Sequence, residues 1–288
     1  MDGFLLVDKP CGPSSFAVVK RARLKLGCDK AGHAGTLDPL ASGLVIVALG
    51  AATRLLSYLP EEPKRYRFGI RFGTQTDTLD TEGIVTAEGG RVPAREEILA
   101  ALPAFIGKIP QVPPKYSAVK VRGKRAYARA RDNEEFDIAE KTVTVFSLEL
   151  VNFDQAQGIA ECEAACSRGT YVRALVRDIA AEGLGTLAHA SFIRRLSIGP
   201  FTVGTALAFD SLSLQSGQAV IPVRTALSSV PSATLSREQC AILAHGKDIG
   251  LAATADTVIG YTEKGDVAAV LTKKEDGVYH PEKVFVKG

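Results

Sequence analysis

Strict alternation of apolar and basic residues near residue 70 predicts a β-strand. Tyr66, Phe68, Ile70 and Phe72 occupy every second position, with arginines at three of the other positions nearby. A period of two places one set of side chains in a core and the other set in solvent. Apolar runs predict further strands over 3–7, 143–150 and 159–166, with a turn over 152–158 and a compact apolar segment over 44–49.

Three segments carry helical start and stop signals. Ser14 is a candidate N-cap for a helix that continues to Leu26 and ends at Gly27. A second helix is expected over 96–105, and a third over 170–182 before Gly183. Because helices and strands alternate without a regular βαβ rhythm, we expect an α+β domain with a mixed, largely antiparallel sheet.

The pattern changes after about residue 230. One short helix is predicted over 236–244 and short strands over 257–260, 268–271 and 283–286, with charged turns at 263–266 and 274–277. Turn residues at this density predict a small β-barrel-like unit. We therefore place a domain boundary near Ser232, with one domain over 1–231 and a second over 232–288.

Composition excludes several classes of protein. The chain has 288 residues, 46% hydrophobic and 23% charged, which suits a large core and excludes wholesale disorder. Its longest stretch without Asp, Glu, Lys or Arg is 15 residues, whereas a membrane span needs about 20 apolar residues. The N-terminus also lacks the apolar run of a secretory signal. We expect a cytoplasmic protein, and nothing in the sequence demands more than a monomer.

The spacing of the cysteines does not predict a metal site. Cys162 and Cys166 are spaced C-x3-C, and the sequence contains no second pair of the kind that structural zinc requires. The five cysteines are therefore interpreted as free thiols in a reducing compartment.

Basic residues cluster although the net charge is only +3. Seven Lys and Arg and no acid lie between 115 and 131, with two tyrosines interleaved. A second cluster spans 64–67, and a third set consists of Arg168, Arg173, Arg177, Arg194 and Arg195. Cations beside aromatic rings suit a phosphate backbone whose bases stack, so a nucleic acid is the leading ligand. Three solvated charged faces are the alternative.

The most informative segment is the glycine-rich loop GHAGTLDPLASG over residues 32–43. Its glycines permit tight turns or a close approach to a ligand. Pro39 disfavours helix at Asp38, so this carboxylate is expected on an extended or turn backbone, five residues after His33. Taken alone, Asp-Pro in such a loop is usually turn chemistry.

The full string resembles the catalytic loop of the TruB family of tRNA pseudouridine synthases. The family pattern G-H-x-G-x-L-D-P-x-A-x-G is matched at every fixed position. Other segments resemble further motifs of the family. In chain order they are GFLLVDKP at 3–10, KRY at 64–66 with GTQTDTLDTEG at 73–83, PPKYSA at 113–118 with GKRAY at 123–127, and SRGTYVR at 167–173 with IRRL at 193–196. More weakly, GKDI at 246–249 and HPEKVF at 280–285 resemble the PUA-type domain of bacterial members.

The resemblance implies an isomerase, without metal or cofactor, that converts uridine 55 in the T-loop of tRNA into pseudouridine. Asp38 would be the catalytic carboxylate acting on a flipped-out uridine. Whether it attacks the sugar, attacks the base or removes a sugar proton stays open. Arg173 would pair with and orient Asp38, Tyr66 would stack on the base, and Tyr171 and Ile193 would wall the pocket.

Other residues would act outside the chemistry. His33 would fill the space that the extruded nucleotide leaves. An RNA-contacting insertion over about 113–137 would hold the T-arm through Lys115, Lys120, Lys124 and Arg125. Asp80 either caps its loop or contacts the substrate, and Lys9 would shape the floor of the cleft.

Two other functions compete with this one. A tRNA-binding folding factor would use the same basic clusters but would not need Asp38 beside Arg173. A small-molecule glycosidase with an aspartate nucleophile would need a second carboxylate about 5 Å away, which no motif supplies.

Overall fold

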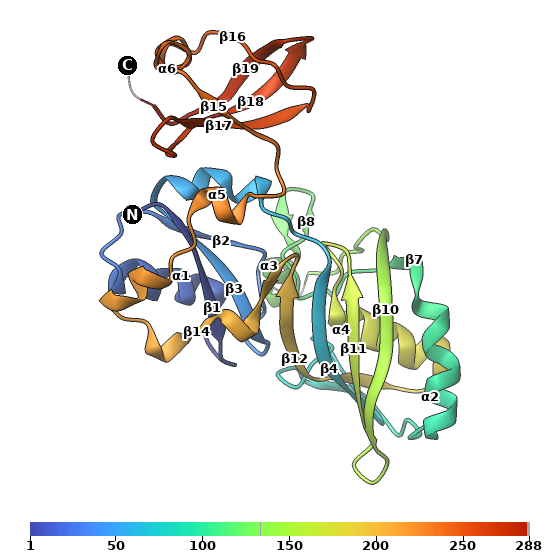
Figure 1. The fold of residues 1–288 in the computed structure, drawn as a ribbon. Coiled ribbons are helices and arrows are strands. Elements are labelled where there is room, and N and C mark those ends of the chain that lie inside the picture. The colour runs from blue at the N-terminus through green and yellow to red at the C-terminus, as the bar shows by residue number, and fades with distance from the viewer. Residues whose placement is uncertain (133, 287–288) are drawn as a thin grey trace.

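Two β-sheets organise the chain, which the computed structural model describes over residues 1–132 and 134–286. The larger sheet lies in the lower part of Figure 1, and the smaller one, in orange and red, lies above it. Asn133 belongs to the predicted insertion, and Lys287 and Gly288 to the predicted second domain; these three residues lie outside the described ones.

The larger sheet has ten strands of mixed direction. They are β1 (Gly3–Lys9), β2 (Ala31–Ala34), β3 (Ser42–Leu49), β4 (Lys64–Phe72), β7 (Gly107–Gln111), β10 (Lys141–Asp154), β11 (Ile159–Cys166), β12 (Ala188–Ile198), β13 (Phe201–Thr202) and β14 (Leu207–Ala208). The main order is β14-β1-β3-β12-β4-β11-β10-β7, with β2 beside β3 and β13 beside β12. Only β1–β14 and β3–β12 are parallel pairs, so the predicted α+β class with a largely antiparallel sheet is confirmed.

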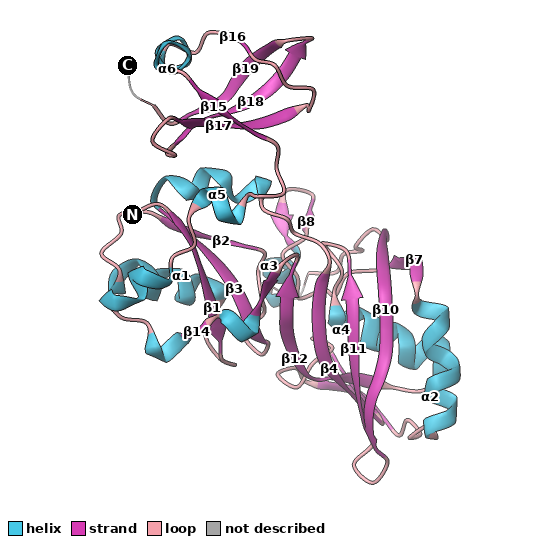
Figure 2. Cartoon of the chain, viewed as in Figure 1, coloured by secondary structure: helices cyan, strands magenta, loops and turns pink. Residues whose placement is uncertain are grey.

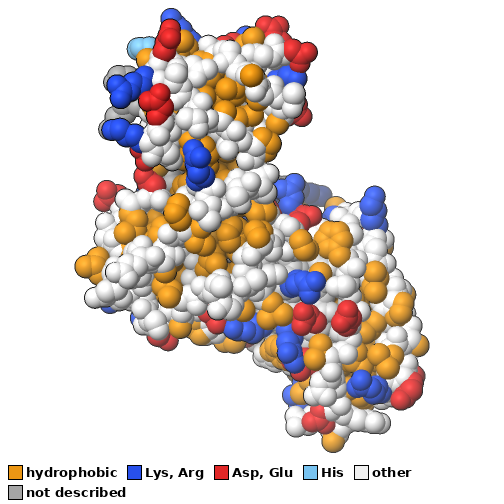
Figure 3. Space-filling view, in the orientation of Figure 1, with side chains coloured by type: hydrophobic (Ala, Val, Ile, Leu, Met, Phe, Trp, Pro, Cys, Tyr) orange, Lys and Arg blue, Asp and Glu red, His pale blue; other side chains and the backbone are white. Residues whose placement is uncertain are grey.

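The predicted alternation along β4 is confirmed. Its four alternating apolar residues are buried. On the opposite face Arg65 and Arg67 pair with Glu163 and Glu161 of β11, at 3.7 and 2.5 Å. On the part of the sheet turned toward the viewer in Figure 3, basic and acidic side chains accordingly lie next to one another.

The sequence pattern did not predict β12, the strand at the centre of the sheet. It pairs with β4 on one side and with β3 on the other. A strand that is mostly buried on both faces loses the polar alternation that would reveal it.

Three helices cover one face of this sheet and join one core cluster with it (Figure 2). They are α1 (Ser15–Lys25), α2 (Arg95–Ala101) and α4 (Val172–Asp178). The predicted N-cap of α1 is confirmed, because the Ser14 hydroxyl accepts a hydrogen bond from the Ala17 amide at 3.1 Å.

Two helix predictions are wrong at their ends. The helix predicted over 96–105 is α2 followed by the 3₁₀ turn η2 (Leu102–Phe105), since Pro103 has no N–H to continue an α-helix. The helix predicted over 170–182 begins only at Val172, because Tyr171 is extended and donates its N–H to Gln111 Oε1 at 2.8 Å. It ends in the π-helical turn η3 (Ile179–Gly183).

Short elements connect the main ones. They are η1 (Gly50–Tyr58), β5 (Thr74–Thr76), β6 (Val85–Glu88), β8 (Lys120–Val121), β9 (Lys124–Arg125), α3 (Ala126–Arg131), η4 (Val203–Thr205), η5 (Phe209–Ser211), η6 (Leu214–Ala219) and α5 (Val223–Ala226). The predicted insertion therefore contains the β8–β9 hairpin and α3.

The smaller sheet contains β15 (Ser232–Leu235), β16 (Ile249–Gly250), β17 (Thr257–Thr262), β18 (Val267–Glu275) and β19 (Val278–Val284), with α6 (Arg237–Ala244) beside them. Its order is β15-β17-β18-β19-β16, an open, curved half-barrel. The strand predicted over 283–286 is misplaced, because β19 runs through Pro281, which is tolerated at a bulge opposite Leu271.

The two halves of the large sheet meet where β3 passes β12. The parallel pairing is confined to Ser42 with Arg194 and Gly43 with Arg195. Gly43 has φ +105°, and a Cβ there would lie 2.2 Å from the Arg195 carbonyl oxygen. Only glycine permits this approach of two backbones.

We expect Gly43→Ala to lower the free energy of unfolding by more than backbone strain alone does. Gly107→Ala is the control, because Gly107 has φ +102° and open space around it. Strain costs about 1–3 kcal/mol at either site, and crowding at Gly43 adds about 1–3 kcal/mol. Urea denaturation measures both, and equal losses would contradict a close contact at Gly43.

Candidate active site

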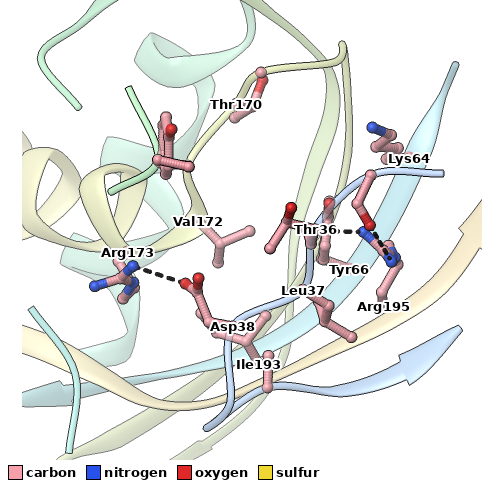
Figure 4. A pocket seen from close by; sticks show the side chains of 15 residues that line it. Thr36, Leu37, Asp38, Lys64, Tyr66, Thr170, Val172, Arg173, Ile193 and Arg195 are labelled. Carbon is pink, nitrogen blue, oxygen red and sulfur yellow. Dashed lines mark hydrogen bonds and ion pairs between the residues drawn. The ribbon is translucent and has the colours of Figure 1, made fainter. Parts of the chain in front are cut away.

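A cavity of about 270 Å³ lies where the two halves of the large sheet meet. Its walls come mainly from loop 35–41, the start of β4, residues 169–173 and β12 (Figure 4). The structure brings together five of the predicted site residues on these walls: Asp38, Tyr66, Tyr171, Arg173 and Ile193.

An ion pair joins Asp38 and Arg173 at one side of the cavity. Arg173 Nη2 donates to Asp38 Oδ2 at 2.7 Å. The Arg173 side chain is 5% exposed and that of Asp38 is 37% exposed, so the carboxylate remains accessible from the cavity. Arg173 also donates to the carbonyls of Thr78 and Tyr116, at 2.6 and 3.0 Å. These contacts fix the orientation of the guanidinium and, through it, of Asp38.

A second carboxylate, from Asp80, holds Arg173 from the other side. Asp80 Oδ2 lies 3.2 Å from Arg173 Nη1, and the Asp80 side chain is 3% exposed. Its Oδ1 accepts from the Thr78 hydroxyl at 2.6 Å and from the Glu82 amide at 3.0 Å. Of the two roles left open by the sequence, these contacts favour loop capping, and they add the positioning of Arg173.

Buried polar contacts fix the loop that carries Asp38. Lys9 Nζ donates to the carbonyls of Pro10, Pro13 and Pro39, at 2.9, 2.8 and 3.1 Å. The Ser15 hydroxyl exchanges two hydrogen bonds with the Leu37 backbone. Burial lowers the pKa of Lys9 to about 8. Asp38 therefore lies between two anchored residues of its loop.

Aromatic and apolar side chains form the cavity walls. Tyr66 is 8% exposed, and burial raises the pKa of its hydroxyl. Tyr171 is held by paired hydrogen bonds between its backbone and the Gln111 side chain, at 2.8 and 3.2 Å. Lys141 Nζ lies 4.4 Å from the centre of the Tyr171 ring. A planar ring fits a site of this composition.

His33 is not among the residues that line the cavity. It lies on β2, half-buried, and its Nδ1 has no hydrogen-bond partner among the described residues. Burial and the nearby positive charge of Arg195 lower the pKa of this imidazole, so the neutral ring is favoured.

The cations of the insertion are partly neutralised by acids that follow the basic run 115–131 within the same insertion. Lys124 Nζ lies 2.5 Å from Asp132 and 2.7 Å from Glu134, and Arg129 also pairs with Glu134. Within the described residues Lys115, Lys120 and Arg125 form no ion pair, and all three are exposed. Of the four cations predicted to contact RNA, Lys124 is therefore paired with acids, and the other three have no ion pair within the described residues.

Two cations of the cavity are absent from the predicted site residues. Lys64 and Arg195 line the side away from the Asp38–Arg173 pair (Figure 4). Lys64 could have been found, because it occupies an inward position of the β4 alternation two residues before Tyr66. Arg195 offered no such signal, since β12 shows no alternation.

Residues 1–132 and 134–286 contain neither a membrane-spanning helix nor a cluster of metal-ligating side chains. No helix there is long and apolar enough to cross a bilayer. No group of three or more His, Cys, Asp or Glu side chains there is placed to hold a metal ion. What the cavity itself offers is an oriented carboxylate beside a site for a planar ring.

The chain matches the family described as "TruB family pseudouridylate synthase (N terminal domain)" over residues 23–172. It is 42% identical over 256 residues to the tRNA pseudouridine synthase B of Caulobacter vibrioides, covering 87% of this chain and 82% of that protein. It is 38% identical over 300 residues to the tRNA pseudouridine synthase B of Gluconacetobacter diazotrophicus, covering 99% and 97%.

A solved structure shares the fold of the whole chain. A chain of the crystal structure of a Cbf5-Nop10-Gar1 complex superposes with a TM-score of 0.72 at 26% identity, covering 99% of this chain and 85% of that one. The sequence motifs, their assembly around one cavity and these similarities all indicate the same family. The chain belongs to the TruB family of pseudouridylate synthases.

Proposed function

We propose that this protein converts uridine 55 in the T-loop of tRNA into pseudouridine, with Asp38 as the catalytic carboxylate. The observation that carries the proposal is the Asp38 carboxylate, oriented by Arg173 at 2.7 Å on the wall of a cavity that Tyr66 and Tyr171 line. The names of the relatives, tRNA pseudouridine synthase B, support the same reaction.

The reaction is a rearrangement within one nucleotide. The bond between uracil N1 and C1′ breaks, a bond between C5 and C1′ forms, the C5 proton leaves to water, and N1 takes up a proton. Positive charge develops at C1′ as the first bond breaks, and a carboxylate beside it stabilises that charge or captures the carbon covalently. Since the step adds no atoms or electrons, it calls for no redox partner.

The cavity suits a uridine that has left its own stack. Extruding a base costs a few kcal/mol, which contacts with a protein can offset. In this proposal Tyr66 stacks on the uracil, Tyr171 and Ile193 wall it, and His33 occupies the space that the nucleotide vacates.

The substrate is held beyond the cavity by the insertion. We assign contact with the T-arm backbone chiefly to Lys115, Lys120 and Arg125, whose charges are exposed and unpaired within the described residues. Residues 232–288 form, in this proposal, a second RNA-binding domain of PUA type. Recognition then depends on the folded shape of the RNA more than on its sequence.

A tRNA folding factor without chemistry would need neither the Asp38–Arg173 pair nor the second carboxylate of Asp80. Burying a guanidinium with two carboxylates consumes desolvation energy that RNA binding alone does not require. The geometry therefore favours the enzyme.

Replacing Asp38 by Asn should abolish the reaction and preserve RNA binding. With a tRNA transcript tritiated at uridine C5, we expect release of label to fall about 10³-fold or more. Affinity should stay within about tenfold, roughly 1.4 kcal/mol. A transcript with cytidine at position 55 controls for the site. Equal release by both proteins would contradict the role of Asp38, and release from the control transcript would contradict the site.

Replacing Asp80 by Asn should slow the single-turnover rate about 10²-fold, because the new amide group repels Arg173 and the guanidinium loses its position. Asp77→Asn is the matched control, since Asp77 Oδ1 accepts a hydrogen bond from Ile84 on the same loop and Arg173 is not its partner. RNA affinity should be unchanged in both variants. Equal rates for the two variants would contradict the positioning role.

Lys120→Met and Lys124→Met remove the same formal charge but should differ in the salt dependence of tRNA binding. Losing a phosphate contact at Lys120 should reduce the slope of log K against log salt by about 1. Lys124→Met should leave the slope unchanged, because Asp132 and Glu134 already neutralise this ammonium. Identical slopes for the two variants would exclude this division of roles.

A further inference from the structure

Two buried cations lie together in the cavity wall. The exposed fraction is 8% for Lys64 and 1% for Arg195. The backbone at Gly35 passes beside both, since a Cβ there would lie 3.3 Å from Lys64 Nζ and 3.7 Å from Arg195 Nη1. Figure 4 shows this pair on the side of the cavity away from Asp38 and Arg173.

The hydrogen bonds of Arg195 are directed at the protein. It donates to the carbonyl of Leu44 at 2.7 Å and to those of Gly35 and Thr36 at 3.2 and 3.4 Å. Carbonyl oxygens accept these bonds without neutralising the charge. Within the described residues no carboxylate lies within 4.0 Å of either Arg195 or Lys64.

Lys64 Nζ has neither a hydrogen-bond acceptor nor an ion-pair partner in the described part of the chain. The nearby acids are occupied: Glu62 accepts from the Arg168 amide at 2.8 Å, and Glu61 lies 3.9 Å from the Arg168 guanidinium. Burial, and then the charge of Arg195, lower the pKa of Lys64. An ammonium in such a place is costly to the fold unless a ligand supplies the missing anion.

The other end of the cavity shows how the fold treats a buried cation that it neutralises itself. Arg173 has Asp38 and Asp80 on its two sides. Lys64 has no such partner, and the Thr170 hydroxyl, from another residue that lines the cavity, also has no hydrogen-bond partner within the described residues. These unpaired groups of the cavity can both donate hydrogen bonds, so they suit an acceptor with negative charge.

We propose that Lys64, with Arg195 close to it, forms a subsite for an anionic oxygen of the substrate nucleotide, in the cavity that the Thr170 hydroxyl also lines. The subsite rests on the proposed function, because that function places a uridine nucleotide in the cavity. One source of the anionic oxygen is a phosphate next to the flipped uridine. The other is the uracil itself.

The uracil becomes an anion during the reaction. When the N1–C1′ bond breaks, the bonding electrons leave with the base, and the charge spreads onto O2 and O4. When C5 bonds to C1′, this charge is removed. C5 then loses its proton to water and N1 takes up a proton, which gives neutral pseudouridine. A preorganised cation beside the ring would stabilise the anion between the breaking of the first bond and the forming of the second.

Lys64→Met tests the subsite, with Lys108→Met as a control that removes an exposed charge on β7. Single-turnover tritium release and the Kd for the T-arm RNA are measured for both variants and the wild type. We expect Lys64→Met alone to lose about 10- to 100-fold in rate or in affinity, or about 1.4–2.8 kcal/mol. Lys64→Arg should recover part of the loss because it restores the charge.

A neutral methylphosphonate on either side of the target uridine distinguishes the two sources. If a phosphate binds Lys64, the Lys64→Met variant binds the RNA with a higher Kd than the wild type, and this difference disappears when a methylphosphonate removes the charge of that phosphate. If the uracil oxygens bind Lys64, the Lys64→Met variant has a lower single-turnover rate than the wild type, and this difference persists whichever phosphate is replaced by methylphosphonate. Lys64→Met behaving like Lys108→Met in both quantities would overturn the subsite.

Thermal unfolding separates this role from a structural one. Removing a buried cation without a counter-ion should leave Tm unchanged or raise it, whereas loss of a structural contact would lower it. A wild-type protein that released no tritium would overturn the proposed function and the uracil arm together. The Kd comparison would still decide whether Lys64 binds phosphate.

Discussion

The position of the Arg173 guanidinium is the constraint on which the site depends. This one group contacts the carboxylates of Asp38 and Asp80 and the carbonyls of Thr78 and Tyr116. Helix α4, the loop before β3, the loop after β5 and the insertion therefore meet at a single cation. These segments lie far apart in the sequence and meet at Arg173 only in the folded chain. The fold must therefore be complete before Asp38 is oriented.

The sequence predicted what local chemistry determines. The alternation along β4 and the Ser14 cap of α1 each depend on neighbouring residues, and both predictions hold. The loop predicted over 32–43 is shorter than expected, since residues 32–34, with His33, belong to β2 and residues 42–43 to β3. What failed depends on tertiary contacts: β12 is hidden by burial on both faces, and the N-terminal end of α4 is set by Gln111, a residue 60 positions away. The placement of Asp38 beside Arg173 was expected only from resemblance, since spacing alone cannot bring residues 135 positions apart together.

Charge was harder to predict than hydrophobicity. The run of cations in the insertion looked uncompensated because the acids that pair with Lys124 come after it in the sequence. In the cavity the opposite held, since Lys64 and Arg195 were counted in basic clusters but were not assigned to the site, where both line the cavity. A count of charges along the chain says little about which of them a ligand meets, because pairing is decided by the fold.

The smaller sheet has a thermodynamic connection to the larger one. Ile259, Tyr261 and Val270 belong to the same buried cluster as Phe4 and Leu44 of the large sheet. Melting the C-terminal strands would therefore expose apolar surface of the larger sheet to water. A chain cut at the predicted boundary near Ser232 would therefore lose buried apolar contacts, and with them stability, in the part that retains Asp38.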